Sequence, residues 1–401
     1  MIELYSKVLK KTIEVGRIIG SYQGNKKGPT LIFLGGVHGN EPSGVFALQS
    51  VLEELNESRP TFHGQLYALS GNLSALKKGV RYSKVDLNRI WIQKNIDKLR
   101  EHTAIDLNED IHEQIDLYDT IDTILKTVEG PYYFFDLHTT SGETSHFITV
   151  NDNLLNRKFT IQYPLPIVLG IEEFLTGPIL SYINELGYVA FGFEGGQHDS
   201  QFAIENHVSF IHLSMIFTGC ISVSDANFEK HSRRLDDHSL ITKSFFEIIY
   251  HYRIENEEKF HMCPDYMNFQ KIHKNDKLAL NHNHEIIAPL SGRIFMPLYQ
   301  GKGDDGFFII KKIPSVFLKL SKILRKTSVD RLFVLLPGIS WGSDKKDELV
   351  VNLKVARFFT KEFFHLMGYR SKIKDATHLT MKNREVASRD KDYKDQDWFK
   401  K

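Results

Sequence analysis

The stretch LIFLGGVHGNEPSG at residues 31–44 decides how the fold is interpreted. An apolar run ends at two glycines, and His38 and Glu41 then follow three positions apart in a polar turn. Apolar residues at helical spacing resume over residues 43–55, so the stretch predicts a buried strand, a turn and a helix. The polar pair has two interpretations. Glu41 could simply complement the dipole of the following helix, or His38 and Glu41 could be two ligands of a metal ion held above the end of a sheet.

The alternation of strand and helix continues to about residue 220. Apolar, strand-like runs lie at residues 29–36, 65–71 and 131–138, and an apolar helical face repeats over residues 111–128. This alternation is typical of a sheet with helices packed on its faces. We therefore predict an α/β domain over residues 1–225.

The pattern changes after residue 225. The charged stretch at residues 228–238 indicates a solvated linker, and residues 245–313 carry short strands broken by turns, which predicts a smaller β-rich domain. Residues 314–380 are expected to form a C-terminal α/β segment, with a helix over residues 347–368. The last residues, 381–401, are highly charged with little apolar patterning, and we expect a disordered tail there.

The composition is that of a globular protein and excludes several functional classes. Hydrophobic residues make up 41% and charged residues 25% of the 401 residues, and the formal net charge is +1. Such a balance predicts no nucleic-acid partner, and no apolar stretch approaches the ~20 residues of a membrane span, so no membrane association is expected. The two cysteines, Cys220 and Cys263, argue against a disulfide framework and against a thiolate zinc cluster. No signal peptide is evident, so we expect a cytoplasmic protein, and a homo-oligomer is compatible with the sequence.

A metal site at His38 and Glu41 needs a third ligand, because catalytic zinc takes three protein ligands and leaves one position for water. His138, in FFDLHTTSG, is the best candidate, since it ends a second apolar run at a polar turn. In open α/β sheets, ligands gather beyond the carboxyl ends of the strands, so two such ends can converge on one ion. Asp136, two residues earlier, is expected to point away from the site.

Other polar residues stand in comparable positions. Glu194, in YVAFGFEGG, is either a solvent-facing carboxylate at a turn or a general base for metal-bound water. The stretch GVRYSKVDLNRIW supplies Arg81, Asn88 and Arg89, whose guanidinium groups suit carboxylates and developing oxyanions but could equally form surface ion pairs. Asp86, within the same stretch, is expected to brace the arginine turn.

Four motifs in a fixed order carry a resemblance to a known family. They are G-x-H-G-N-E-P-S-G, K-K-x-x-R-Y-x-x-x-D-L-N-R, F-D-L-H-x-T-x-S, and a glutamate at the end of a strand. Together they resemble the aspartoacylase/succinylglutamate desuccinylase family, relatives of the zinc carboxypeptidases, over residues 29–220 and more loosely to residue 313. The resemblance implies a zinc-carboxypeptidase-like α/β/α sandwich with a mixed central sheet as the zinc-hydrolase catalytic domain, with the β-rich domain capping its site.

The resemblance also implies a role for each motif residue. It assigns one zinc ion per chain to the ligands His38, Glu41 and His138. Glu194 becomes the base that deprotonates the zinc-bound water and later returns the proton to the leaving amine, and Arg81 polarises the scissile carbonyl. The substrate's α-carboxylate is assigned to Asn88 and Arg89.

The implied activity is that of a zinc metallohydrolase acting on a non-peptide amide bond. Its partner would be a small-molecule N-acyl amino acid of the N-acetyl or N-succinyl type, from which the enzyme removes the acyl group. Two alternatives stay open at this point: a carboxypeptidase-like enzyme acting on short peptides, and a non-catalytic protein that binds carboxylates.

Two features bear on the substrate. Aspartate-specific members of the family grip a second carboxylate with an arginine in the segment before the strand-end glutamate, but residues 174–194 contain neither arginine nor lysine. His198 could supply a donor instead. Within the β-rich domain, IIAPLSGRIFMPL is similar to lipoyl-type β-folds without an evident attachment lysine, which favours a structural cap, and Tyr299 and Lys302 could reach the cleft from it.

Overall fold

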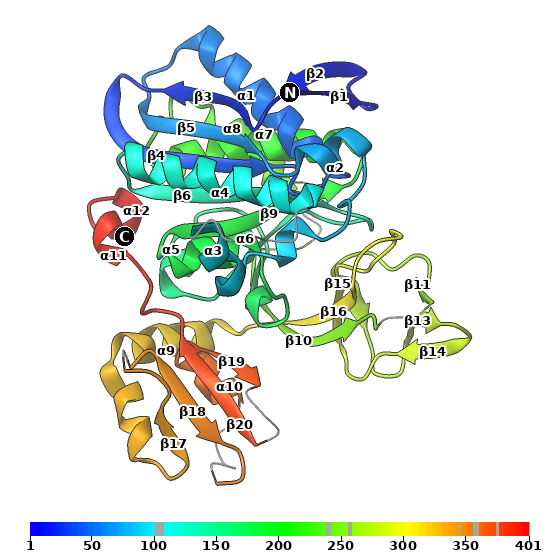
Figure 1. Cartoon of the computed structure of the whole chain (residues 1–401), viewed down its shortest axis with the longest axis vertical. Coiled ribbons are helices and arrows are strands. Elements are labelled where there is room, and N and C mark those ends of the chain that lie inside the picture. The colour runs from blue at the N-terminus through cyan, green and yellow to red at the C-terminus, as the bar shows by residue number, and fades with distance from the viewer. Residues whose placement is uncertain are drawn as a thin grey trace.

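The computed structural model describes residues 1–100, 108–237, 241, 243–255, 259–344, 346–355, 361–373 and 377–400. Its centre is an eleven-stranded sheet (Figure 1). In spatial order, the strands of this sheet are β12 (Lys271–Ile272), β15 (Gly292–Phe295), β16 (Asp305–Lys312), β10 (Phe245–Arg253), β8 (Ile167–Leu169), β7 (Phe147–Val150), β9 (Val189–Gln197), β6 (Tyr132–Thr140), β4 (Lys26–Gly35), β5 (His63–Ser70) and β3 (Ile18–Gln23).

The sheet is mixed. Strand β4 pairs in parallel with β5 and β6, and β6 pairs in parallel with β9. The antiparallel pairing of β9 with β7 then reverses the direction, and β7, β8 and β10 are again parallel to one another. The predicted α/β fold with a mixed central sheet is confirmed.

Helices cover both faces of the sheet. They are α1 (Ser43–Ser58), α2 (Leu73–Lys78), α3 (Gln93–Arg100), α4 (Glu109–Thr127), α5 (Leu154–Thr160), α6 (Ile179–Glu185), α7 (Gln201–Phe217) and α8 (Phe228–Asp237), with short 3₁₀ turns η1 (Leu87–Arg89) and η2 (Ile171–Glu173). Alternate residues of β4 face opposite cores, because side chains of a strand alternate between faces. Leu31 and Phe33 pack in the core beneath α1 and α7, whereas Ile32 and Leu34 pack in the core beneath α4 and α6.

The β-rich region is continuous with the central sheet. Strand β10 pairs in parallel with β8, and β16, β15 and β12 extend the sheet beyond β10. Strands β11 (Phe260–Met262), β13 (Lys277–Asn281) and β14 (His284–Ile287) form a separate three-stranded sheet beside them. A further hairpin, β1 (Ile2–Ser6) with β2 (Lys11–Val15), lies at the N-terminal end.

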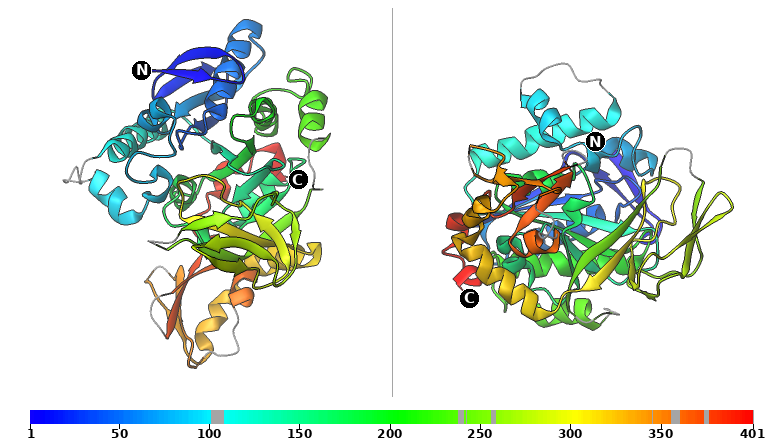
Figure 2. Two further views of the ribbon diagram at one scale, coloured as in Figure 1. Left: turned by 90° about the vertical axis from the view of Figure 1, so that its right-hand side faces the viewer. Right: turned by 90° about the horizontal axis from the view of Figure 1, so that it is seen from below.

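The C-terminal α/β segment lies at the opposite end of the molecule from that hairpin (Figure 2). A four-stranded antiparallel sheet, in the order β17 (Ile339–Trp341), β18 (Glu348–Asn352), β20 (His378–Asn383) and β19 (Tyr369–Ile373), packs with α9 (Ser315–Lys326), η3 (Ser328–Leu335) and α10 (Lys361–Leu366). The predicted helix over residues 347–368 is wrong at its start. Residues 348–352 form β18, because Leu349 and Val351 alternate into a core shared with Met381.

Within the described residues 381–400, the chain forms two short helices and not the expected disordered tail. Helices α11 (Asp390–Tyr393) and α12 (Asp397–Lys400) return to the central sheet, away from the C-terminal segment (Figure 1). The Trp398 Nε1–H donates to the Tyr133 hydroxyl at 2.8 Å, and the Val189 amide donates to the Tyr393 hydroxyl at 3.0 Å. Two buried aromatic side chains therefore anchor a segment whose composition alone predicted disorder.

The charged stretch at residues 228–238 also differs from expectation. Residues 228–237 form α8, which packs on α7 with His231 and Leu235 buried. Two inward side chains in a charged stretch are enough for a helix to pack.

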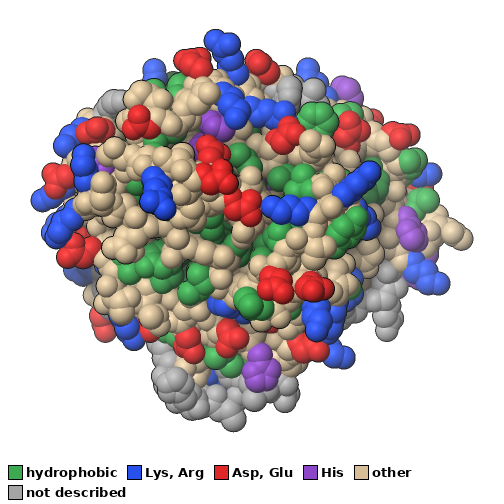
Figure 3. Space-filling view, turned by 90° about the horizontal axis from the view of Figure 1, so that it is seen from above, with side chains coloured by type: hydrophobic (Ala, Val, Ile, Leu, Met, Phe, Trp, Pro, Cys, Tyr) green, Lys and Arg blue, Asp and Glu red, His purple; other side chains and the backbone are tan. Residues whose placement is uncertain are grey.

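On the face seen from above in Figure 3, acidic and basic side chains are interspersed. Among the described helices, none has the length and apolar character that crossing a bilayer requires.

Candidate active site

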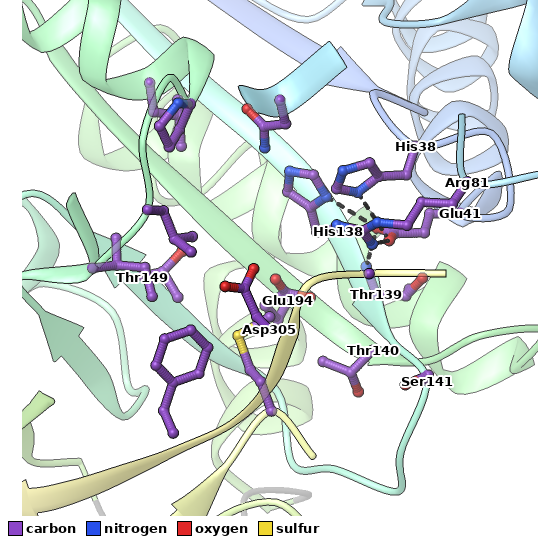
Figure 4. A pocket seen from close by; sticks show the side chains of 18 of the residues that line it. His38, Glu41, Arg81, His138, Thr139, Thr140, Ser141, Thr149, Glu194 and Asp305 are labelled. Atoms are coloured by element: carbon purple, nitrogen blue, oxygen red, sulfur yellow. Dashed lines mark hydrogen bonds and ion pairs between the residues drawn. The ribbon is translucent and has the colours of Figure 1, made fainter. Parts of the chain in front are cut away.

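Two histidines and a glutamate meet beyond the carboxyl ends of β4 and β6. His38 lies in the turn after β4, Glu41 precedes α1, and His138 lies near the end of β6. The Nδ1 atom of His38 is 3.1 Å from Glu41 Oε1, and the Nδ1 atom of His138 is 2.9 Å from Glu41 Oε2. One candidate ligand atom from each residue lies within 4.8 Å of the others. Figure 4 shows the three side chains converging from different elements.

Glycines shape the turn that carries two of these residues. Gly36 directly follows the strand with φ +68°, a conformation that favours glycine, and redirects the chain. Gly39 passes so close to α2 that a Cβ atom would lie 2.0 Å from the Ala75 carbonyl carbon. A side chain is therefore disfavoured at Gly36 and at Gly39, and the chain can turn tightly there. The turn brings His38 and Glu41, which flank Gly39, close to His138 of β6.

An aspartate holds the far nitrogen of each histidine. His38 Nε2 lies 3.1 Å from Asp86 Oδ1, and His138 Nε2 lies 2.7 Å from Asp136 Oδ2. The expectation that Asp136 points away is wrong, because residues two apart in a strand share a face. Such carboxylate partners fix the imidazole orientation and commonly support metal-ligating histidines. Both Nδ1 atoms are consequently aimed at the space around Glu41.

The charges of Glu41 and the two histidines stabilise one another. Although burial alone would raise the pKa of Glu41, the neighbouring His38 and His138 hold it well below its usual value. Burial opposes a charged His138, but Asp136 and Glu41 raise its pKa well above the usual value. Glu41 is therefore a carboxylate at neutral pH, as a metal ligand must be.

The donor set suits zinc. Two imidazole nitrogens and one carboxylate oxygen are the ligand types of catalytic zinc sites, in which three protein ligands leave one position open. All three side chains are buried, with exposed fractions of 2–8%. The aspartate partners of both histidines complete the arrangement. The residues present therefore fit a single zinc ion.

Glu194 lies beside this cluster without joining it. In the β6–β9 ladder it is the register partner of His138, and it is buried. Its Oε2 atom is enclosed and has no hydrogen-bond partner among the described residues. Burial raises the pKa of Glu194 to about 8, against a lowering by His138 and with a further increase from Glu41. A buried carboxyl with one oxygen unsatisfied is suited to exchange a proton with a ligand.

Arg81 connects the cluster to the following loop. Its Nε–H donates to Asp86 Oδ2 at 3.2 Å, and its Nη1–H donates to Glu41 Oε1 at 3.4 Å. The expected bracing of the arginine turn by Asp86 is therefore present. Sequence inspection missed the residue that anchors the loop itself: the buried Asp110 carboxylate accepts the amides of Ser83, Lys84 and Val85.

Asn88 and Arg89 line the same cavity, but both already have partners. Asn88 Oδ1 accepts the Ile179 amide at 2.9 Å. Arg89 Nη2–H donates to Asp305 Oδ2 at 2.8 Å, and the other oxygen of Asp305 is 2.8 Å from His251 Nε2. Although burial acts in the opposite direction, His251 and Arg89 lower the pKa of Asp305 to about 2. The β-rich region thus supplies a carboxylate that sequence inspection did not single out.

The loop between β15 and β16 forms one wall of the cavity. Gln300 Oε1 accepts from Asn40 Nδ2 at 2.8 Å and lies 3.3 Å from His198 Nε2. Lys302 does not point into the cavity, because its Nζ donates to the Tyr82 carbonyl at 2.9 Å. Tyr299 instead donates to the Cys263 carbonyl at 2.8 Å. Gln300 and Asp305, rather than the two expected residues, reach the site from this region.

All seven residues expected at the site border one cavity of about 120 Å³. They are His38, Glu41, Arg81, Asn88, Arg89, His138 and Glu194. The sequence signals were the strand-end positions and the motif order. Asp86 and Asp136 lay within those motifs, whereas Asp305 stood in a polar turn without a pattern of its own.

Comparison with known proteins gives one family match and several similar folds. Residues 27–168 match the sequence model of the succinylglutamate desuccinylase/aspartoacylase catalytic domain. A succinylglutamate desuccinylase/aspartoacylase from Rhodobacter sphaeroides has TM-score 0.53 and 16% identity, over 73% of this chain and 88% of that one. Succinylglutamate desuccinylase from Vibrio cholerae has TM-score 0.51 and 13% identity, over 77% and 90% of the respective chains. The product-bound ectoine utilization protein EutE from Ruegeria pomeroyi has TM-score 0.51 and 18% identity, over 73% and 87%. At these identities the structural likeness is one of fold.

Proposed function

Because residues 27–168 belong to the succinylglutamate desuccinylase/aspartoacylase catalytic-domain family, we propose that this protein is a zinc-dependent deacylase that hydrolyses the amide bond of an N-acyl amino acid. One observation carries the proposal. A two-histidine, one-glutamate ligand set lies beside a buried glutamate that is not part of it, within a single cavity. A binding protein has no need for an unsatisfied buried carboxyl at that position.

The chain's own residues divide the chemistry among them. When bound at His38, Glu41 and His138, zinc supplies Lewis acidity that polarises a carbonyl and lowers the pKa of water. Glu194 accepts a proton from the attacking water and returns it to the amine nitrogen as the C–N bond breaks. Arg81 directs its guanidinium toward the oxyanion that develops on the carbonyl oxygen.

The substrate's free carboxylate is assigned to Asn88 and Arg89. Asn88 keeps its Nδ2–H donors for a ligand, since its Oδ1 is used by Ile179. Arg89 offers Asp305 only part of its five-donor fork, so further N–H groups can meet a carboxylate. Binding in this way leaves the amide of the substrate to face the zinc ligands.

A small substrate is favoured over a peptide. The cavity of about 120 Å³ is below the ~300–1,000 Å³ of pockets for larger ligands. The Gln300–Asn40 hydrogen bond ties the β-rich region to the turn that carries His38 and Glu41, which supports a capping role for that region. We place the activity in the cytoplasm, because both cysteines are free thiols, as a reducing compartment maintains.

Replacing Glu194 by glutamine tests the mechanism. Glu194→Gln keeps the shape of the side chain but removes the proton acceptor, so zinc content should stay at one per chain while kcat falls about 10²–10⁴-fold. The exposed Glu57→Gln on α1 is the matched control and should keep the parent rate. Zinc is measured by metal analysis and turnover by amine release from a panel of N-acetyl and N-succinyl amino acids.

Three outcomes would change the assignment. A Glu194→Gln protein with nearly the parent rate removes Glu194 as the base. Loss of zinc in that variant makes Glu194 a ligand. A parent protein that binds zinc but hydrolyses no member of the panel contradicts the deacylase function itself.

A further inference from the structure

The cavity has a second, apolar end. Much of its lining is apolar and includes Ile171, Leu175, Leu180, Met296, Leu298 and Phe308. Leu180 and Thr149 both lie against Gly192, and Figure 4 shows Thr149 well apart from the histidines. The six apolar residues come from η2, the following loop, α6 and the β-rich region, so both parts of the molecule contribute. The apolar end is therefore a built feature of the fold.

Packing behind the wall gives it a fixed shape. Ile171, Leu175 and Met296 pack against a core cluster that contains the buried rings of Phe147 and Phe295. The floor continues along β7, where Thr149 faces the cavity; in Figure 4, Glu194 and Asp305 lie between Thr149 and the histidines. A substrate group that points past Glu194 would thus enter an apolar chamber.

The charges along the cavity wall do not provide for a second anion at this end. Among the described residues that line the cavity, the arginines are Arg81 and Arg89, and no lysine is present. Arg81 already pairs with Glu41 and Asp86, and Arg89 pairs with Asp305. The polar groups at the apolar end, Thr149 and Asn151, are neutral. Burying a carboxylate without a cationic partner is costly, whereas burying an aliphatic group is favourable.

We propose that this chamber selects N-acyl amino acids that carry a single carboxylate and an apolar side chain or acyl group, and discriminates against dicarboxylic substrates. The inference rests on the proposed deacylase function and narrows its substrate class. The free α-carboxylate meets Asn88 and Arg89, the amide lies at Glu194, and the apolar group occupies the space bounded by Leu175, Leu180 and Phe308.

Two pairs of nearly isosteric ligands test the proposal. N-acetyl-leucine against N-acetyl-aspartate varies the side chain, and 4-methylpentanoyl-glycine against succinyl-glycine varies the acyl group. Dissociation constants are measured by calorimetry on the zinc-loaded Glu194→Gln protein, which cannot consume the ligands. We expect the apolar member of at least one pair to bind about tenfold tighter or more, and the dicarboxylate to be preferred in neither. Any other pattern, including no measurable binding, overturns the inference.

A matched pair of variants tests the chamber itself. Leu175→Arg introduces a cation at the wall, and in the ligand pair that the parent discriminates it should shift the binding ratio toward the dicarboxylate by about tenfold. Leu175→Met preserves volume and apolar character and should keep the parent ratio. An unchanged binding ratio in Leu175→Arg contradicts the proposal. If that variant does not fold, equal binding of both ligands of each pair by the parent contradicts it instead.

Failure of the inference is distinguishable from failure of the proposed function. A parent enzyme that hydrolyses N-acetyl-aspartate as fast as N-acetyl-leucine, and succinyl-glycine as fast as 4-methylpentanoyl-glycine, remains a deacylase, but the chamber does not select. A protein that binds the apolar ligands preferentially and hydrolyses neither retains the selective chamber and lacks the proposed activity.

Discussion

Each histidine of the candidate zinc site is held between Glu41 and an aspartate, so the aspartates should affect metal affinity without touching the metal. Asp136→Asn removes the charge that orients His138, and we expect zinc affinity to fall about 10–100-fold. His138→Ala removes a proposed ligand, so its zinc content should fall to background. Competition with a chromogenic chelator measures the zinc binding of both variants.

The exposed Asp116→Asn on α4 is the control for the charge change and should keep the parent affinity. Full zinc occupancy of His138→Ala would show that the ligand set is assigned to the wrong residues. Parent affinity in Asp136→Asn would show that the hydrogen bond to His138 contributes nothing to the site.

At the level of single residues, the sequence predicted those that stand at strand ends within ordered motifs. His38, Glu41, His138 and Glu194 could be named because a strand end followed by a polar turn is visible in one dimension. The pairing of Arg89 with Asp305 could not be predicted, since 216 positions separate the two residues and only the β16–β10–β8 pairings bring them together. Asp136 was expected on the wrong face of its strand, although its spacing of two residues from His138 already indicates that both side chains share one face.

Among the structural elements, the loop that carries Arg81, Asn88 and Arg89 depends on one buried carboxylate. Asp110, at the start of α4, accepts three consecutive backbone amides of this loop and the Asn72 side chain. Asp110→Asn should therefore loosen the loop, raise the KM for N-acyl amino acids by about tenfold and lower stability by roughly 1–3 kcal/mol. Zinc content should persist, because none of the three proposed ligands lies on the loop.

Steady-state kinetics, urea unfolding and metal analysis together check this expectation. Asp119→Asn, exposed on the same helix, is the matched control. An Asp110→Asn protein with reduced stability and an unchanged KM would show that the anchor supports the fold but does not position the arginines.

Elements of the N-terminal α/β region were easier to predict than those that follow it. Strands 29–36 and 131–138 were foreseen because parallel strands buried on both faces are continuous apolar runs. The stretch at 348–352 was assigned to a helix because one short strand of an antiparallel sheet has too few residues to distinguish period 2 from period 3.6. Helix α8 was missed because only two of its residues face inward.

At the scale of the whole molecule, a buried ion cluster joins the C-terminal segment to the central domain. The Asp152 carboxylate accepts from Arg157 at 2.8 Å, from Arg325 of α9 at 2.7 Å and from Arg384 at 2.9 Å. Burial alone would raise the pKa of Asp152, but the three guanidinium groups hold it well below its usual value. Asp152→Asn removes the carboxylate that the three arginines share and leaves Arg325 with Glu385 and Arg384 with Glu172, so we expect a loss of about 3 kcal/mol at pH 7, the lower end of the range for a broken buried ion pair.

The pH dependence follows from the direction of this shift. Because the folded-state pKa is lower than the unfolded value of about 3.9, the contribution is complete above that pH and declines as the pH falls toward the folded pKa. The stability difference between parent and Asp152→Asn should therefore shrink below about pH 4, by up to about 1.4 kcal/mol per pH unit. Urea unfolding from pH 7 to pH 3 measures it, with the exposed Asp225→Asn as control. A difference that stays constant over this range would contradict the role of the charge.

The parallel pairing of β8 with β10 determines how this chain can be divided. Its sequence changes character between residues 225 and 245, but the hydrogen bonds of the sheet continue across that point. A shortened protein ending before Phe245 would leave Ile167, Val168 and Leu169 as an apolar, unpaired edge, and edges of this kind recruit strands from other chains. Such a protein would also lose Asp305 and with it the partner of Arg89. Aggregation on expression would then report an exposed sheet edge, and would say nothing about the catalytic residues.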